Sequence, residues 1–264
     1  MRRFFALALA LCLALPLTGC AKKPSWRYEL DTRRDAGDYT ARDGTLLSWY
    51  GYELPYLRLL SDDAAPGAEP PEDLAAARDA FNAAIERWHA QLSEEYHDME
   101  QMAIGDFIDN GAESFSQTGN CVGIAETYQT ARLLSVRMEG YSDWGGAYPW
   151  SFVRAWAFDL ETGEFVQWYD LAKEPDALRA ALAAEVIRQA REQRLDRGFY
   201  DGWEEEAERF DGCEVYLGGE ALTVVFSEQL LGPRAAGRPE FSIAYGDVSQ
   251  YFNDYGKQLL KKEG

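Results

Sequence analysis

The sequence predicts an α+β fold, in which an antiparallel sheet packs against helices in two closely associated subdomains. Three observations lead to this class. Segments of strand character occur in runs, long stretches carry an apolar residue every three or four positions, and 47% of the 264 residues are hydrophobic. A chain of this length and composition has enough apolar side chains for a substantial core.

The first element is an export signal at residues 1–19. A basic start precedes an apolar run over residues 4–17, which is shorter than the ~18–20 residues needed to span a bilayer. The run ends in Leu-Thr-Gly-Cys, which resembles the bacterial lipoprotein signal, whose cleavage leaves Cys20 as a lipid-modified N-terminus. We therefore expect a lipoprotein anchored by lipid in the cell envelope, outside the cytoplasmic membrane. The alternative is an ordinary secretory peptide with an incidental cysteine.

The next segments are a tether, a strand region and a long helix. Residues 20–43 are polar and are expected to form the tether. Residues 46–60 are rich in Leu, Trp and Tyr and predict one or two strands broken at Pro55. A helix is expected over residues 71–98, with a kinked continuation to residue 108, because its apolar side chains recur at helical spacing.

Strands dominate the remainder of the chain, and helices separate them into groups. The expected strands cover residues 122–128, 134–138, 152–158, 165–169, 213–217, 221–226 and 241–245. The expected helices cover residues 175–190, 199–210 and 248–260. We place the border between an N-terminal subdomain, residues 44–138, and a C-terminal domain, residues 139–264.

The acidic balance limits the classes of partner. The chain has 26 basic and 45 acidic residues, a net charge of −19, and loss of the two signal arginines leaves 24 against 45, a net charge of −21. Such a surface repels nucleic acid and attracts basic proteins. Nucleic acid is therefore not expected as a partner, whereas a cationic protein is. The alternative is that the acidity only keeps an exported protein soluble.

No catalytic residue, metal site or cofactor is expected. His89 and His97 lie eight residues apart on one predicted helix. That spacing separates them by about 12 Å along the axis, so they cannot ligate one ion. Nucleophile elbows, zinc spacings and phosphate-binding glycine loops are absent from the sequence. Many carboxylate pairs are present, so an enzyme that cleaves cell-wall glycan through two carboxylates remains an alternative to a binding function.

Two cysteines remain for a disulfide. Cys12 leaves with the signal and Cys20 takes the lipid, so Cys121 and Cys213 are left. Export permits a disulfide between them, and we expect one. The alternative is two unpaired buried thiols.

The glycine-containing loop within residues 141–150 has the composition of a binding surface. Its glycines and Pro149 favour a tight turn, and exposed Tyr and Trp make good anchors for a protein partner or a sugar ring. The alternative is that these aromatic side chains fill the core of the domain itself. The candidate ligand-binding residues are Tyr141, Trp144, Gly145, Gly146, Tyr148 and Trp150.

Two segments carry a resemblance to a known family. Residues 141–148 read Tyr-Ser-Asp-Trp-Gly-Gly-Ala-Tyr, and residues 158–163 read Phe-Asp-Leu-Glu-Thr-Gly. Together they look like the Y-x-Y-x-G-G-A-H…F-D-x-x-T-G signature of the RsiV-like C-terminal domain, domain of unknown function 3298. Residues 230–243 are similar to the ending of that domain. The resemblance covers roughly residues 140–252, and the region before it resembles the usual N-terminal companion domain more loosely.

The resemblance implies an extracytoplasmic pair of domains. One branch of the family is a transmembrane anti-sigma factor whose outer part binds lysozyme. This sequence shows no sigma-binding segment, so anti-sigma action is not expected, and Tyr148 stands where the family usually has His. The resemblance and the acidic charge favour an envelope lipoprotein that binds or senses a protein or cell-wall ligand, a lysozyme-like cationic enzyme being the sharpest candidate. A structural envelope lipoprotein without a soluble ligand is the third hypothesis.

Overall fold

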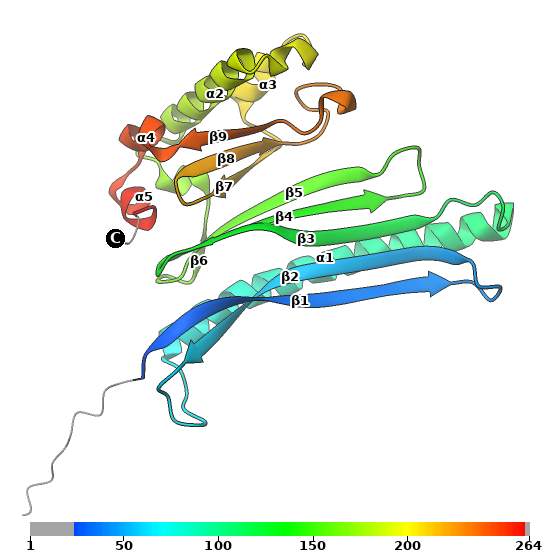
Figure 1. The fold of residues 1–264 in the computed structure, drawn as a ribbon, viewed down its shortest axis with the longest axis horizontal. Helices are drawn as coiled ribbons and strands as arrows, with labels where there is room; N and C mark the ends of the chain where they lie inside the picture. Colours follow the sequence, from blue (N-terminus) through cyan, green and yellow to red (C-terminus); the bar gives the residue numbers. More distant parts are fainter. Residues whose placement is uncertain (1–23, 262–264) are drawn as a thin grey trace, which may run out of the picture.

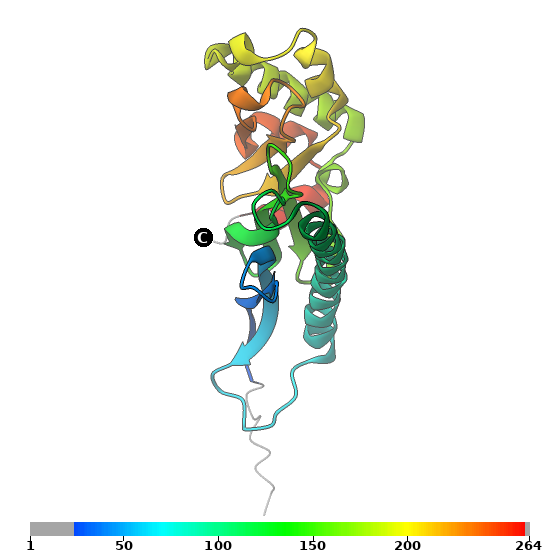
Figure 2. The ribbon, with the colours of Figure 1, turned by 90° about the vertical axis from the view of Figure 1, so that its right-hand side faces the viewer.

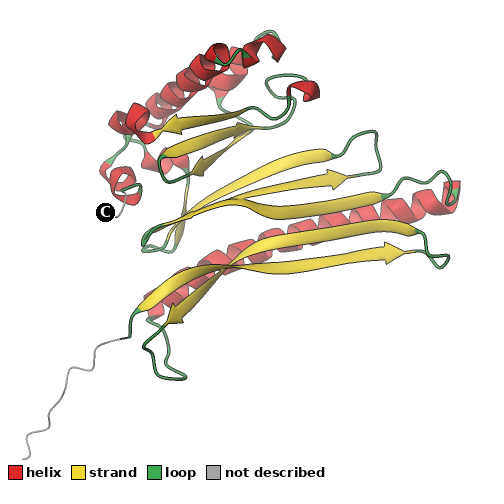
Figure 3. Cartoon of the chain, viewed as in Figure 1, coloured by secondary structure: helices red, strands yellow, loops and turns green. Residues whose placement is uncertain are grey.

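Two sheets organise the protein, and the α+β class is the one expected (Figures 1 and 3). A computed structural model describes residues 24–261, so the signal sequence and Cys20 lie outside the described residues. The larger sheet has the order β1-β2-β3-β4-β5-β6 and is antiparallel except for the β2–β3 pair. The smaller sheet is antiparallel, with the order β7-β8-β9.

The strands are β1 (Trp26–Thr40), β2 (Leu46–Ser61), β3 (Thr118–Gln129), β4 (Leu133–Asp143), β5 (Trp150–Asp159), β6 (Glu164–Val166), β7 (Cys213–Leu217), β8 (Ala221–Phe226) and β9 (Glu240–Ala244). The helices are α1 (Glu72–Asn110), α2 (Pro175–Glu192), α3 (Trp203–Arg209), α4 (Tyr245–Val248) and α5 (Asp254–Leu259). No helix in this described part of the chain combines the length and the apolar character of a membrane span.

Residues 26–40, which were expected to belong to the tether, form β1 instead. This strand pairs with β2 along its whole length and lies at the edge of the larger sheet. Half-buried side chains alternate with exposed ones, and Tyr28 and Leu30 pack against the core. An edge strand with one solvated face needs few apolar residues, which is why its sequence resembles a polar linker.

β2 runs unbroken through Pro55, where a break was expected. β3 pairs only with residues 48–52 of β2, so this side of β2 has no neighbouring strand at Pro55 and tolerates a residue without an N–H. On the same free side of β2, two residues later, the side chain of Asn82 from α1 satisfies the backbone groups of Leu57. Its amide oxygen accepts from the Leu57 N–H at 2.8 Å, and its amide nitrogen donates to the Leu57 carbonyl at 3.0 Å.

α1 is one continuous helix of 39 residues that covers one face of the larger sheet (Figure 2). The expected kink near residue 98 is absent, because the buried stripe continues beyond that point and holds the last turns on the sheet. The buried residues of α1 are Ala77, Phe81, Ile85, Leu92, Met99 and Ala103.

β4 is buried on both faces, and it joins the two parts of the protein. Leu134 and Val136 pack in the core under α1, whereas Leu133 packs in the core formed by α2 and the smaller sheet. The border expected between residues 138 and 139 therefore falls inside β4. The larger sheet continues to β6. The second unit is the part of the chain after β6, which contains α2 and the smaller sheet, and it covers the opposite face of β4 and β5.

The C-terminal segment differs from the single helix expected over residues 248–260. α4 and α5 are separated by a 3₁₀ turn, Ser249–Tyr251, and by an isolated bridge between Phe252 and Ala172. Asn253 caps α5 by accepting from the Gly256 N–H at 2.7 Å. The expected strand at residues 165–169 is likewise shorter: β6 ends at Val166, and a 3₁₀ turn follows. The other expected strands and helices lie where they were predicted, within a few residues.

The segment at residues 158–163 anchors the junction between the two units. The fully buried Asp159 pairs with Arg132 at 2.9 Å, and it accepts from the Glu161 N–H at 2.9 Å and the Tyr255 hydroxyl at 3.0 Å. Burial alone would raise the pKa of Asp159, but these partners together hold that pKa below its ordinary value. Gly163 has φ +74°, a left-handed conformation that favours glycine.

Candidate functional site

The connection between β4 and β5 leaves three of the predicted aromatic residues on the surface. Trp144 is 42% exposed, Tyr148 73% and Trp150 50%. Tyr141 instead lies on β4, where its ring centroid is 5.9 Å from that of Trp49. Tyr141 is therefore half-buried on the sheet and belongs to neither core, while the other three side chains are available to a ligand.

The start of this loop is held in one conformation. The Gly145 N–H donates to Oδ1 of Asp143 at 3.0 Å, and Gly145 has φ +76°. A Cβ at this position would lie 2.6 Å from the side chain of Ser116, so only glycine fits there. Gly146 meets no such neighbour within 4 Å. Of the two predicted glycines, Gly145 is the one that the turn requires.

Arg234 fixes the end of the same loop. Its guanidinium donates to the Pro149 carbonyl and lies 5.2 Å from the centroid of the Tyr148 ring. A cation over an aromatic face is attracted to the ring electrons, so Tyr148 is held although it is largely exposed. Arg234 belongs to the segment at residues 230–237. The fold thus brings together two of the segments that carry the family resemblance, through residues 85 positions apart in the sequence.

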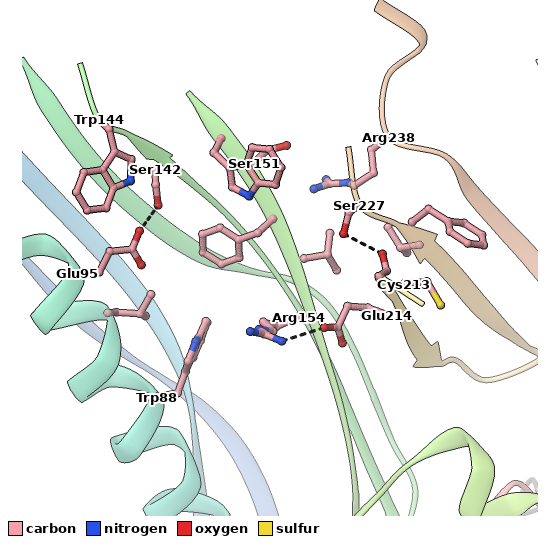
Figure 4. Close-up of a pocket in the computed structure, with 17 residues that line it drawn as sticks. Trp88, Glu95, Ser142, Trp144, Ser151, Arg154, Cys213, Glu214, Ser227 and Arg238 are labelled. Atoms are coloured by element: carbon pink, nitrogen blue, oxygen red, sulfur yellow. Dashed lines mark hydrogen bonds and ion pairs between the residues drawn. The ribbon is translucent and has the colours of Figure 1, made fainter. Parts of the chain in front are cut away.

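A cleft of about 610 Å³ adjoins Trp144 and Trp150. Figure 4 shows α1 on one side of this cleft and the β7–β8 hairpin on the other, with β5 between them. α1 contributes Trp88, which packs edge-on against Trp156 of β5 with ring centroids 4.8 Å apart. Trp88 belongs to the helix predicted over residues 71–98, whereas no sequence signal indicated the polar residues of the cleft.

The cleft exists because β5 has an open outer edge. β6 pairs only with residues 157–159 of β5, so residues 150–156 have no neighbouring strand on that side. One group on this edge is satisfied by a side chain, since the Ala155 N–H donates to Glu214 of β7 at 3.1 Å. The second oxygen of Glu214 accepts from Arg154 at 3.2 Å. Burial raises the pKa of Glu214 in spite of these contacts.

Other polar groups of the cleft differ in whether they have partners. Glu95 of α1 accepts from the Ser142 hydroxyl at 2.8 Å. Arg238 pairs through Nη2 with Glu139 at 3.3 Å, but its Nη1 is buried without a hydrogen-bond partner. The hydroxyl of Ser151 is also buried and unpartnered. Both residues line the cleft, and each keeps an unused hydrogen-bonding group at its wall.

The two remaining cysteines are free thiols, so the expected disulfide is not formed. Cys121 lies on β3, and β4 and β5 separate it from β7, which begins at Cys213 (Figure 1). Two intervening strands at a spacing of about 4.8 Å exceed the reach of a disulfide. Cys213 instead donates to the Phe210 carbonyl at 3.3 Å, and burial raises the pKa of its thiol to about 12.

The histidines of α1 differ from each other. His97 is exposed, whereas only 15% of the His89 side chain is exposed. Its Nε2 lies 2.8 Å from Asp35 and its Nδ1 2.8 Å from Arg33 of β1, so it ties the edge strand to the helix. Within residues 24–261, no group of His, Cys, Asp and Glu is arranged to hold a metal ion.

No protein-family model matches the sequence, and no curated protein matches it. Two solved structures share its architecture. A DUF3298 family member from Bacteroides fragilis superposes with a TM-score of 0.63 and 14% identity, covering 90% of this chain and 98% of that chain. A DUF3298 family protein from Pseudomonas aeruginosa gives a TM-score of 0.55 at 13% identity, with the same coverage. The chain has the DUF3298 fold.

The expected resemblance is thereby confirmed for the architecture. The likeness to the two solved structures spans 90% of this chain, so it takes in the region before residue 140, where the sequence resemblance was looser, as well as residues 140–252. It includes the long sheet with α1 as well as the second unit. DUF3298 denotes a domain of unknown function, so the likeness describes how the chain folds and leaves the function to be argued from the site.

Proposed function

We propose that this protein is an extracytoplasmic ligand-binding module of the cell envelope, whose ligand surface comprises the loop at residues 144–150 and the adjoining cleft. The exposed aromatic side chains of the loop, whose backbone is held at both ends, support this proposal most directly. Asp143 and Arg234 hold the loop from both ends. A preorganised aromatic surface loses little conformational entropy on binding, and Trp and Tyr are the residues that most often dominate binding energy.

The charge of the chain supports a cationic protein as the ligand. A net charge of −19 attracts a basic partner over distances longer than a contact, which raises the association rate at low salt. We propose a lysozyme-like enzyme as the partner, because it combines high positive charge with an extracytoplasmic location. Charge then governs encounter, and the aromatic loop governs how long the complex lasts.

The contacts of the cleft carboxylates favour binding over glycan cleavage. Both oxygens of Glu214 accept hydrogen bonds that hold β5 and β7 together. Glu95 of the opposite wall accepts from Ser142. A glycosidase needs one carboxyl to protonate the leaving oxygen and a second to act as base or nucleophile. Incubation with purified peptidoglycan should therefore release no sugar, and release that is lost in Glu95→Gln would contradict the binding proposal.

Trp144→Ala should weaken the binding of lysozyme about 30-fold, which corresponds to about 2 kcal/mol for an anchor residue. The loss should appear as faster dissociation, while the melting temperature should change little because 42% of Trp144 is exposed. Surface-based kinetics and thermal melting measure the two effects separately. Tyr200→Ala is the matched control, since Tyr200 is 46% exposed and lies away from the cleft.

Two results would contradict this interpretation of Trp144. Dissociation equal to that of the control would remove it as an anchor, and a large drop in melting temperature would assign it to the core instead. Salt provides a further check, because raising it to 1 M shortens the Debye length to ~3 Å and should slow association with the wild-type protein. Absence of lysozyme binding at low salt would leave the module with a different envelope ligand.

We also propose that the module is tethered through Cys20, which lies outside the described residues. The motivation is the Leu-Thr-Gly-Cys ending of the signal sequence. Several acyl chains, each contributing ~0.8 kcal/mol per buried methylene, give stable anchoring. Cys20→Ser should yield a protein without lipid, and mass spectrometry of the wild-type N-terminus should find the lipid on the cysteine. An unmodified N-terminal cysteine would refute the tether.

A further inference from the structure

We propose that the open edge of β5 accepts an extended peptide segment of a protein partner as an additional β-strand. The proposal rests on the binding function above and assigns a recognition mode to the cleft. Adding a strand to an exposed edge uses main-chain hydrogen bonds for affinity and side-chain pockets for specificity. The direction of the backbone groups of β5 is the first argument for it.

Between Ser151 and Ala155, every second residue of β5 directs its backbone polar groups toward the cleft. Ala155 pairs opposite Arg137 of β4, yet its N–H donates to Glu214 and not to β4. Ala155 therefore occupies a non-hydrogen-bonded position of the antiparallel ladder, in which both backbone groups point away from the partner strand. The β4–β5 register has no bulge, so Val153 and Ser151 occupy the same kind of position.

The protein satisfies both ends of this edge and leaves the middle open. At one end, Glu214 accepts from the Ala155 N–H. At the other end, Arg234 donates to the Pro149 carbonyl. Between them, the N–H and C=O groups of Ser151 and Val153 face the cleft with no neighbouring strand. At ~3.4 Å per residue, a peptide of about four residues covers this open stretch.

The second argument is the chemistry of the walls. Arg238 and Ser151 line the cleft, and the Nη1 of Arg238 and the hydroxyl of Ser151 are buried without a hydrogen-bond partner, so a small shift of either side chain would let it donate to a carboxylate in the cleft. Aromatic side chains on the α1 side, among them Trp88, suit an apolar residue of the peptide. We therefore assign the occupant as an extended segment that carries an Asp or Glu next to apolar residues.

The other outer strand of the larger sheet offers no such site. β1 carries charged side chains in close succession, including Glu29, Asp31 and Arg33, and charged residues are the usual protection of an exposed edge. The pocket that includes residues 34–36 of β1 extends across β2 and β3 and so lies over the sheet, not beyond its free edge. The open stretch of β5 is thus the edge at which main-chain pairing and side-chain pockets occur together.

The experiment uses octapeptides selected from a random displayed library against the protein and then synthesised. Val153→Pro should reduce their affinity at least tenfold, the loss expected for removing one of the few main-chain hydrogen bonds. The melting temperature should change little, because the N–H that proline removes takes no part in the β4–β5 ladder and edge strands tolerate proline. Val153→Ala keeps the N–H and is the matched control, with near-wild-type affinity.

A second arm changes the peptide and leaves the protein intact, so it holds even if Val153→Pro does not fold. N-methylation at successive positions should abolish binding at alternate residues only, the ones whose N–H faces β5. Arg238→Gln should remove the preference for Asp or Glu in the peptide. Arg209→Gln changes the charge equally at an exposed site outside the cleft and should have no effect.

Three results would overturn strand addition. They are no selected peptide above background, binding insensitive to N-methylation at every position, and selective binding of di-N-acetylchitobiose that Val153→Pro leaves unchanged. The last result would assign the cleft to a saccharide. Trp144-dependent lysozyme binding is measured on the same variants. If it persists while the peptide results fail, the strand inference fails and the binding module stands, whereas loss of both removes the proposed function as well.

Discussion

Replacing Arg137 by methionine is expected to lower the free energy of unfolding by about 3 kcal/mol. Arg137 is 5% exposed and lies on β4. It donates to both oxygens of Glu240 on β9, at 2.6 and 2.7 Å, and to Glu139 at 2.6 Å. Its pKa is raised, with the hydrogen bond to Glu240 as the largest cause. This one side chain joins the larger sheet to the smaller sheet.

The loss should exceed what a surface arginine gives. Methionine fills similar space, but it removes the positive charge that attracts the carboxylates of Glu139 and Glu240 to the same place. Arg188→Met is the control, because Arg188 also contacts two glutamates but is 51% exposed on α2, where such pairs contribute at most about 1 kcal/mol. Urea denaturation measures both variants. Equal destabilisation would show that burial of Arg137 does not matter.

Asp159→Asn is expected to destabilise the protein by about 3 kcal/mol at neutral pH, because it breaks an ion pair with a buried carboxylate and leaves Arg132 with the exposed Glu161 as its ionic partner. Asp159 is fully buried and holds Arg132 and Tyr255 at the junction of the two units. Asp176→Asn is the control, since Asp176 pairs with Arg179 on the surface and is 93% exposed. Thermal or urea denaturation at pH 7 should separate the two variants clearly.

The same pair gives a pH dependence whose direction is fixed by the lowered pKa of Asp159. A carboxyl whose pKa is lower in the folded state stabilises the fold fully above its unfolded pKa of ~4. That stabilisation is lost as the pH falls through the lower, folded value. The difference in stability between wild type and Asp159→Asn should therefore shrink below pH ~4. A difference that stays constant between pH 7 and pH 3 would contradict this assignment.

Periodic elements could be predicted from the sequence because their cause is local. The apolar stripe of α1 recurs at helical spacing, and the strands at residues 134–138 and 152–158 alternate or run apolar between turn residues. β1 could not be recognised, because an edge strand with one solvated face needs no apolar run. The disulfide was wrongly predicted because counting cysteines carries no information on the distance between β3 and β7.

The candidate site was predictable only where it is continuous in sequence. The aromatic loop could be found because glycine, proline and aromatic residues occur together within ten positions. The cleft beside it could not, because its walls come from α1, β5 and the β7–β8 hairpin. Glu214 and Arg238 became part of the site because the fold packs β7 and the segment before β9 beside β5. Nothing in their local sequence distinguishes them from other charged residues.

The length of β1 has a mechanical consequence for a protein anchored at its N-terminus. β1 begins at Trp26, only a few residues after Cys20, and its 15 residues extend about 50 Å at ~3.4 Å each. The aromatic loop lies toward the other end of the larger sheet (Figure 1). The larger sheet therefore acts as a rigid spacer, stiffened along its length by α1. For a lipid-anchored chain, it presents the loop and the cleft well beyond the lipid headgroups, within reach of a large partner that never touches the membrane.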